Sequence, residues 1–415
     1  MSPELIIRPG ANDQQVIAEL LSPGPTSTLP MWGPPISRIV VDAHLVARLP
    51  LIADAAAAVG IPYLIDPDTH FLQTNLRPTD AWAKLPFGQA QPVTPSDFAT
   101  SGARDDLVDR TVSFQVEAGA TAVIAPYLYA GDPDDPWFQL SLELLHQTSK
   151  HMDSVGIRLP LIAVLCGQLQ SFGAEKNVNG GLDRFAAAAL ESGAAAIAPC
   201  LSPSGSQHDG YHKVLRLFRT FDQLRETKLP VLAWRQGVYG RALVASGAAG
   251  YETGIGTNEQ TDVLRAMANR RPREDGRKKS GAAAPGIFLE ALGRSVSPPI
   301  GAALLANLRM RAKIMCDDES CCPLGVRSTL ENHRQHAVRA RSRALNILDE
   351  MPQRTWRLHR IASDARATAT LIDQANRILR SEQVEATLHG TYAESIARVA
   401  EFLLGTGDAR SQPAC

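Results

Sequence analysis

The chain lacks the features that mark several large classes of protein. Its 415 residues contain no uninterrupted apolar run of about 18 to 20 residues, so no membrane span is expected. Residues 1–30 lack the basic head and apolar core of a secretory signal, and we therefore expect a cytoplasmic protein. The formal net charge of −1 excludes a protein coated in basic residues, although it permits a local basic face. Six cysteines are too few for a disulfide-stabilised scaffold.

The sequence does contain a regular series of short apolar runs bounded by Pro, Gly and Asp. Eight runs are predicted as strands: residues 38–43, 63–66, 122–127, 161–166, 195–200, 231–235, 250–256 and 286–292. Most are apolar on both faces, which is typical of parallel strands buried beneath an outer layer of helices. Helical spacing fills the intervals, most clearly over residues 106–120, 138–156, 182–194 and 211–227.

This alternation predicts an α/β fold, a (β/α)8 TIM-type barrel with a C-terminal helical appendage. An open doubly wound sheet is the alternative, but no Gly-x-Gly-x-x-Gly turn follows the first predicted strand. We expect an N-terminal extension over residues 1–30, the barrel over 31–305 and the appendage over 306–415. Residues 67–105 form a long excursion over one barrel mouth, and loops of that length are more often functional than idle.

Polar residues at the predicted strand ends are the candidates for chemistry, because the carboxyl ends of barrel strands converge on one mouth. Asp66 ends a strand and begins a polar run, where its carboxylate could act as a base or hold a substrate amide; it could also be a turn former. Asp42 lies at the end of the neighbouring strand and could pair with Asp66 or with a structural arginine. Arg235 and Gln236 offer planar donors for a purine-like edge or a phosphate, unless Arg235 only neutralises a carboxylate.

Glycines and cysteines suggest two further sites. Gly254 and Gly256 follow a predicted strand just before a helix, where backbone amides could hold a phosphate, although such a turn needs no ligand. Cys316, Cys321 and Cys322 are followed by His333 and His336, which is the stoichiometry of a closed structural zinc site. A reduced cysteine-rich turn or a redox pair is the alternative. One histidine suffices for four ligands; His336 is the candidate, but the spacing does not decide between it and His333.

With these residues considered together, the chain resembles the tRNA-guanine transglycosylase family, whose relatives include enzymes that insert deazaguanines into DNA. The resemblance rests on the order of parts over residues 228–336: KLPVLAW, GYETGIGTNEQTDVL, GIFLEAL and then the cysteine cluster with its histidine. Upstream, LIDPDTHFLQ is similar to the family's Asp-Ser-Gly-Gly-Phe-Gln, which makes Asp66 the match for its active-site aspartate.

The resemblance implies exchange of a guanine in tRNA or DNA for a modified base. A flipped base would enter the mouth, with Asp66 as base, Gln168 and Arg235 at the edge of the flipped base, and Gly254 and Gly256 on the phosphate side. Glu290 is the carboxylate on the strand that carries the family's nucleophile.

Regional charge agrees with a nucleic-acid partner. Residues 309–360 hold eleven Lys or Arg against six Asp or Glu, including Arg339, Arg341 and Arg343, and a basic segment spans 270–279. The alternative functions are a barrel enzyme for a small phosphorylated metabolite and a non-catalytic nucleic-acid-binding or scaffold protein.

Overall fold

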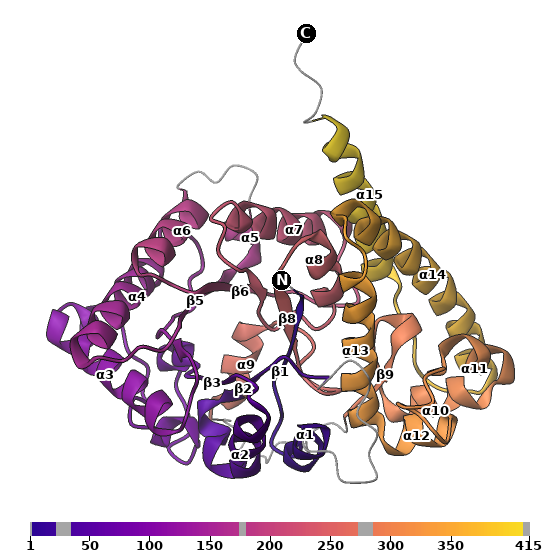
Figure 1. Cartoon of the computed structure of the whole chain (residues 1–415), viewed down its shortest axis with the longest axis horizontal. Helices are drawn as coiled ribbons and strands as arrows, with labels where there is room; N and C mark the ends of the chain where they lie inside the picture. The colour runs from indigo at the N-terminus through magenta and orange to yellow at the C-terminus, as the bar shows by residue number, and fades with distance from the viewer. Residues whose placement is uncertain (1, 22–34, 174–179, 273–284, 410–415) are drawn as a thin grey trace.

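The computed structural model describes residues 2–21, 35–173, 180–272 and 285–409, and a closed parallel sheet lies at its centre (Figure 1). The strands of this sheet are β1 (Glu4–Ile7), β2 (Arg38–Asp42), β3 (Tyr63–Asp66), β4 (Val123–Ile124), β5 (Leu161–Gln168), β6 (Ala196–Ser202), β7 (Leu232–Ala233) and β8 (Gly250–Thr253). Two ladders run in the orders β3-β2-β1-β8-β7 and β4-β5-β6. Thr121 N donates to Tyr63 O at 2.8 Å, and Ile197 N donates to Pro230 O at 2.9 Å, so the ladders meet at both ends. The predicted (β/α)8 barrel is confirmed.

The predicted set of strands is wrong at its two ends. The first barrel strand is β1, which lies inside the segment expected to be an extension and pairs in parallel with both β2 and β8. The last predicted strand is outside the barrel: β9 (Ile287–Leu289) forms an antiparallel hairpin with β10 (Arg294–Val296). Both runs are apolar, and an apolar run alone does not specify which strand will pair with it.

A helix follows each barrel strand, and all of these helices except the last cover the outside of the sheet (Figure 1). These helices are α1 (Gln14–Leu21), α2 (Pro50–Val59), α3 (Ser101–Glu117), α4 (Pro136–Val155), α6 (Gly181–Glu191), α7 (Tyr211–Arg225), α8 (Gly240–Ser246) and α9 (Val263–Arg270), with a short α5 (Leu169–Phe172) before α6. The last, α9, lies within the ring of strands in this view and bonds to Ser202, His44 and Asp80 on the side of the carboxyl ends of the strands. The four helices predicted most clearly correspond to α3, α4, α6 and α7. Gly156 ends α4 with φ of 76°, a left-handed conformation that glycine adopts without a steric penalty.

The long excursion after β3 is a packed structure. It contains three short 3-10 helices, Thr69–Gln73, Trp82–Lys84 and Pro95–Phe98. The side chain of Trp82 is fully buried and donates from Nε1 to Pro67 O at 2.8 Å. This bond ties the excursion to the residue that follows β3, so the segment holds the barrel mouth in shape.

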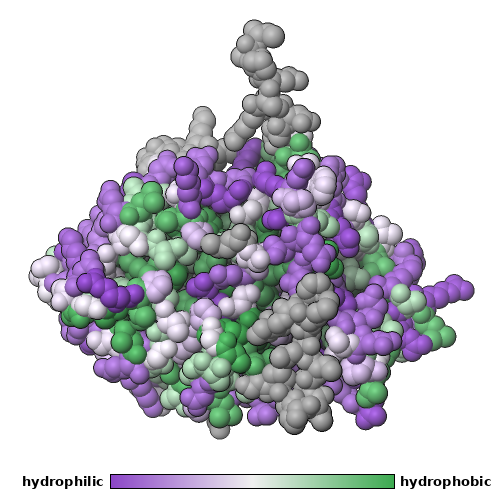
Figure 2. Space-filling model, viewed as in Figure 1, coloured by the Kyte–Doolittle hydropathy of each residue, from purple (hydrophilic) through white to green (hydrophobic). Residues whose placement is uncertain are grey.

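The C-terminal part is helical, as predicted. It comprises α10 (Pro298–Ala306), α11 (Leu308–Ile314), α12 (Val326–Glu331), α13 (His333–Asp349), α14 (Arg354–Ser381) and α15 (Thr391–Ala409). Helix α13 packs beside β1 and β9, while α14 lies against α8 and α15 against α7 (Figure 1). Figure 2 shows hydrophilic residues around the periphery of this view and hydrophobic residues more often toward its centre. Among the helices of the described ranges, none is both long and apolar enough to cross a bilayer.

Candidate active site

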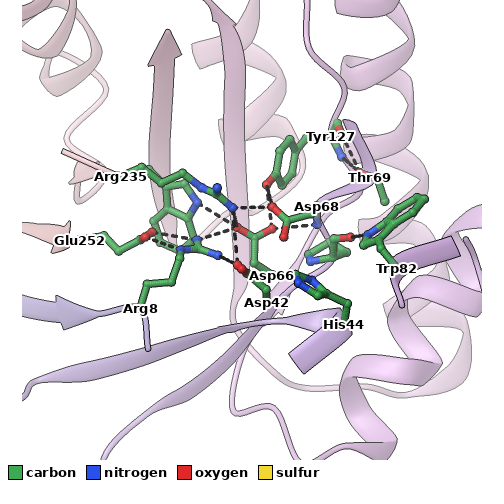
Figure 3. Close-up of polar contacts among 12 residues, drawn as sticks. Arg8, Asp42, His44, Asp66, Asp68, Thr69, Trp82, Tyr127, Arg235 and Glu252 are labelled. Carbon is green, nitrogen blue, oxygen red and sulfur yellow. Dashed lines mark hydrogen bonds and ion pairs between the residues drawn. The ribbon is translucent and has the colours of Figure 1, made fainter. Parts of the chain in front are cut away.

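Charged side chains from five different strands meet at the carboxyl-end mouth of the barrel (Figure 3). They come from the last residues of strands or the first residues beyond them: Arg8, Asp42, Asp66, Asp68, Arg235 and Glu252. We call this set the mouth cluster. Four carboxylates are opposed by two guanidinium groups, so the cluster carries an excess of acidic groups in a place where little water reaches it. Such an arrangement strongly perturbs proton binding.

Arg8 is the central cation of the mouth cluster. Its guanidinium donates to Asp66 Oδ2 at 2.7 Å, to Glu252 Oε1 at 2.5 Å, and also to the Asp42 carboxylate. The Arg8 side chain is only 3% exposed, so these bonds form almost without competition from water. Sequence reasoning missed Arg8 because it follows a strand that was itself missed. The alternative reading of Asp42, as the partner of a structural arginine, matches the geometry.

Arg235 supplies the second guanidinium. Its Nη2 lies 2.5 Å from Asp68 Oδ1 and 3.4 Å from Asp66 Oδ2. Both partners in the shorter contact have left-handed backbones, with φ of 56° at Arg235 and 49° at Asp68. That conformation is unfavourable for residues with a Cβ atom, and strained residues of this kind concentrate at functional sites. Two strained residues thus face each other across the mouth.

The two aspartates that follow one another at the end of β3 have opposite proton affinities. Burial by itself would raise the pKa of Asp66, but the charges of Arg8 and Arg235 outweigh it and lower that pKa to about 2. Burial also raises the pKa of Asp68, and here the neighbouring Asp66 charge raises it further, well above its usual range. The pair therefore consists of a carboxylate that stays ionised and a carboxyl group with a raised affinity for its proton. Two neighbouring carboxyl groups whose pKa values are shifted in opposite directions are typical of the acid and base residues of enzymes.

Two aromatic residues complete the surroundings of these aspartates. The Tyr127 hydroxyl donates to Asp66 Oδ1 at 2.7 Å and lies 3.4 Å from Asp68 Oδ1. Trp234 Nε1 approaches Asp66 Oδ2 at 3.3 Å. Burial raises the pKa of Tyr127, so its hydroxyl stays protonated and remains a donor. Asp66 is held by donors on every side, whereas Asp68 has capacity left for a ligand.

His70 is a second residue near the mouth that sequence reasoning did not select. Its ring is 1% exposed, and neither ring nitrogen has a hydrogen-bond partner among the described residues. Burial lowers the pKa of His70 to about 3, which keeps the imidazole neutral. Its ring stacks on Tyr127 with centroids 5.8 Å apart. A buried polar group without a partner is rare, and it leaves His70 available to a bound ligand.

The other predicted site residues are dispersed. Gln168 ends β5, partly exposed, and Ser171 makes only a 3.5 Å contact with it. Gln236 is buried and bonds to Ser204 and Thr261, so its amide supports a loop. Glu290 lies beyond β9, outside the barrel, where it pairs with Arg343.

The two glycines after β8 have different surroundings. A Cβ at Gly254 would lie 1.9 Å from Thr257 O, so this glycine is needed to close a tight turn. Gly256, with φ of 71°, lines a cavity of about 470 Å³ beside the mouth cluster. Arg8 and Arg235 form part of the wall of this cavity, which therefore adjoins the charged residues of the mouth.

The predicted metal residues are brought together on the appendage. The ligand atoms of Cys316, Cys321, Cys322 and His336 all lie within 4.8 Å of one another. His336 Nδ1 is 3.4 Å from both Cys321 Sγ and Cys322 Sγ, and those two sulfurs are 3.8 Å apart. His333 instead turns its Nδ1 toward Leu330 O at 3.1 Å. The structure thus distinguishes the two histidines that spacing left open.

A second group at the mouth has the residue types of a metal site but a poorer arrangement. Ligand atoms of Asp42, His44 and Asp68 also fall within 4.8 Å of one another. Each is already engaged by an arginine: Asp42 by Arg8, Asp68 by Arg235, and His44 Nε2 by Arg270 at 2.7 Å. These guanidinium groups occupy the space and supply the charge that a cation would provide.

Comparison with known proteins yields likenesses of fold only. A search of family profiles found no match, and neither did a search of curated proteins. A chain from Burkholderia cenocepacia J2315 described as a lyase or mutase has a TM-score of 0.34 and 15% identity, covering 65% of this chain and 81% of its own. The carboxyl transferase domain of Rhizobium etli pyruvate carboxylase has a TM-score of 0.37 and 13% identity, covering 98% of this chain and 61% of its own. A chain from Toxoplasma gondii ME49 described as a deoxyribose-phosphate aldolase has a TM-score of 0.31 and 14% identity, covering 67% and 94%.

The resemblance to the tRNA-guanine transglycosylases is wrong, and the base-exchange function inferred from it is wrong with it. No family profile supports the assignment. The geometry gives the physical reason. Glu290, expected to supply the nucleophile, follows a hairpin strand outside the barrel, and Arg343 neutralises it there.

Proposed function

We propose that the protein is a barrel enzyme that moves a proton on a small anionic metabolite at the mouth cluster. The observation that carries the proposal is the pairing of Asp66 with Asp68: one carboxyl has a pKa of about 2, and the pKa of the other is raised well above its usual range. A carboxyl group whose affinity for a proton is raised, beside a permanently charged neighbour, is suited to general acid–base catalysis.

The geometry suggests a role for each residue. Asp68 would donate its proton to the carbonyl oxygen of the substrate, and its carboxylate would then accept a proton from the adjacent carbon, so that the residue ends the step protonated as it began. Arg235, 2.5 Å from Asp68, would stabilise the negative charge that develops on a carbonyl or carboxylate group. Tyr127 would keep Asp66 ionised through the 2.7 Å bond from its hydroxyl, and Arg8 would hold the cluster together. This set favours isomerase- or lyase-type proton transfer next to a carbonyl.

Deuterium exchange tests the proposal without knowledge of the full reaction. The protein would be incubated in D₂O with a panel of phosphorylated sugars and 2-oxo acids, and carbon-bound deuterium in each compound measured by mass spectrometry. We expect exchange into at least one compound, and Asp68→Asn should slow it at least about 100-fold. Asp106→Asn, on the exposed face of α3, is the matched control and should keep the wild-type rate. Equal rates for both variants would refute the role of Asp68.

We also propose that Cys316, Cys321, Cys322 and His336 bind one structural zinc ion. Zn–S bonds of about 2.3 Å and a Zn–N bond of about 2.0–2.1 Å in a tetrahedron place two sulfurs about 3.8 Å apart and sulfur and nitrogen about 3.5 Å apart. The corresponding distances in the cluster are 3.8 Å and 3.4 Å. His336 Nε2 lies 3.0 Å from Phe288 O. Because a carbonyl can only accept, Nε2 carries the proton and the Nδ1 lone pair faces the sulfurs.

Metal analysis tests the zinc proposal. Purified protein should contain close to one zinc per chain by mass spectrometry of the metal, and Cys321→Ser should lose it. Cys166→Ser, a buried cysteine in β5, is the control and should keep its metal. A metal-free wild-type protein that remains fully folded would contradict the proposal.

A nucleic-acid or purine-like partner and a cytoplasmic location remain predictions. Arg341 and Arg343 bind Glu259 and Glu290, and Arg339 donates to Ser320 O at 2.8 Å. These three arginines are therefore already engaged. Most of the basic segment 270–279 lies outside the described residues. A gel-shift series over increasing salt would decide whether nucleic acid binds.

A further inference from the structure

Two arginines on the wall of the cavity beside the mouth cluster form no ion pair with any described residue. The cavity measures about 470 Å³, and its lining includes Arg8 and Arg235, which also belong to the mouth cluster. Two further arginines line it, Arg265 from α9 and Arg294 from β10. Within the described ranges neither forms an ion pair: Arg294 contacts Gln207 at 3.4 Å and lies over the Tyr392 ring, and Arg265 forms no side-chain bond.

The acidic residues of the same wall already have ion-pair or hydrogen-bond partners. Glu259 pairs with Arg341, and both of its oxygens accept from Ser295, one from the hydroxyl at 2.6 Å. Asp262 caps the first turn of α9 by accepting from Arg265 N at 3.0 Å. The Asp262 carboxylate therefore already accepts a hydrogen bond from the first turn of α9. An anion in the cavity would have to be held by side chains and not by the N-terminus of this helix. Arg265 and Arg294 are therefore the guanidinium groups of the wall that have no ion-pair partner among the described residues.

Unused neutral donors lie on the same wall. Neither Thr257 nor Asn258 forms a hydrogen bond with any described residue, in its backbone or in its side chain. Asn258 has φ of 56°, a strained conformation that Asn tolerates better than most residues. Both residues line the cavity. Two guanidinium groups and several free N–H and O–H donors around one space match a doubly charged group with three terminal oxygens.

We propose that this cavity binds a phosphate monoester of the substrate, with Arg265 and Arg294 as the charged contacts and Thr257 and Asn258 as neutral donors. The inference rests on the proposed function, since it places the phosphate end here and the reacting carbon at Asp68. It differs from a phosphate held on backbone amides of the glycine turn, because Gly254 closes that turn on Thr257 O.

Calorimetry with inorganic phosphate as the probe tests the subsite directly. Wild-type protein should bind phosphate, and R265Q and R294Q should each weaken binding roughly tenfold. R158Q, whose guanidinium is 78% exposed and pairs with Asp153, is the control and should bind as the wild type does. Circular dichroism and the melting temperature would establish that the variants fold. Equal binding in all four proteins would overturn the proposal.

A chemical measurement covers the case in which the variants do not fold. Arg265 and Arg294 in wild-type protein should react with phenylglyoxal, and phosphate should slow both reactions, as followed by peptide mass spectrometry. No protection at either arginine would overturn the subsite. Asp68→Asn separates the two proposals: it should abolish deuterium exchange and leave phosphate binding unchanged. Phosphate binding without any exchange would sustain the subsite and reject the proton-transfer role.

Discussion

At the scale of single residues, the mouth cluster owes its properties to charges placed where water is scarce. Arg8 neutralises three carboxylates that come from β2, β3 and β8. A buried ion is stable only while its partners remain, because the loss of one partner leaves the other desolvated and unpaired. The cluster is thus both a candidate site and a structural bond between three strands.

Replacement of Arg8 should therefore be costly. Arg8→Met keeps much of the side-chain volume but leaves Asp42, Asp66 and Glu252 without their shared cation, so we expect a loss of about 3–5 kcal/mol in the free energy of unfolding. Urea denaturation followed by circular dichroism measures it. Arg158→Met removes an exposed pair and should change stability by less than about 0.5 kcal/mol. Similar effects for both variants would argue against a central role for Arg8.

Asp68 should lower the stability of the folded protein at neutral pH, compared with a neutral side chain of the same size at this position. The unfolded chain ionises Asp68 above its ordinary pKa of 3.8, whereas the folded protein retains the proton because its pKa is raised. Stability therefore falls as pH increases from about 4 toward the folded pKa. Asp68→Asn removes this penalty, so the variant should melt at a higher temperature than wild type at pH 7 and at nearly the same temperature at pH 4. A variant less stable at pH 7 would contradict the assignment.

At the scale of elements, the hairpin of β9 and β10 shows that a sequence with a strong preference for strand does not determine which sheet the strand joins. The run GIFLEAL has the composition of a barrel strand, but Gly293 adopts φ of 63° and turns the chain back on itself. Its partner is the next segment in the chain, so the hairpin stays on the appendage side against α13. Meanwhile four residues near the N-terminus complete the barrel because β2 and β8 both pair with them.

Removal of Glu290 should leave the proposed chemistry intact. Glu290→Ala breaks the pair with Arg343, in which each side chain is 28% exposed, and we expect a loss of about 1 kcal/mol or less in stability. Deuterium exchange on the active compound should continue at the wild-type rate. A large drop in the exchange rate for a correctly folded Glu290→Ala protein would show that Glu290 takes part in the reaction.

At the scale of the whole molecule, the cysteine cluster connects the appendage to the segment that leaves the barrel. The three cysteines lie between α11 and α12, His336 lies on α13, and its Nε2 reaches the carbonyl of Phe288 in β9. A metal ion at this point would fix α12, α13 and β9 relative to one another. No residue of the mouth cluster belongs to this group of four.

Chelation of zinc should loosen this region selectively. Treatment with a strong chelator is expected to increase hydrogen exchange of the amides in α12 and in the first turns of α13, because the metal bonds that hold them are lost. Amides of β2, β3 and β8 should keep their protection. Mass spectrometry of peptides after exchange measures both sets, and uniform loss of protection across the chain would show that the metal holds the barrel as well.

The amino-acid sequence alone determined the alternation of buried strands and outer helices, the helical C-terminal part and the three cysteines of the metal cluster. These features are local, because apolar periodicity and the spacing of cysteines depend only on residues that are close together in the chain. Asp42, Asp66 and Arg235 were also recognised, since strand ends in a barrel share one mouth. Tertiary structure alone decided that Arg8 neutralises those carboxylates, that β1 rather than β9 closes the barrel, and that Asp66 and Asp68 differ in proton affinity. Pairing between strands distant in the chain, and the electric field at a buried group, depend on the whole fold.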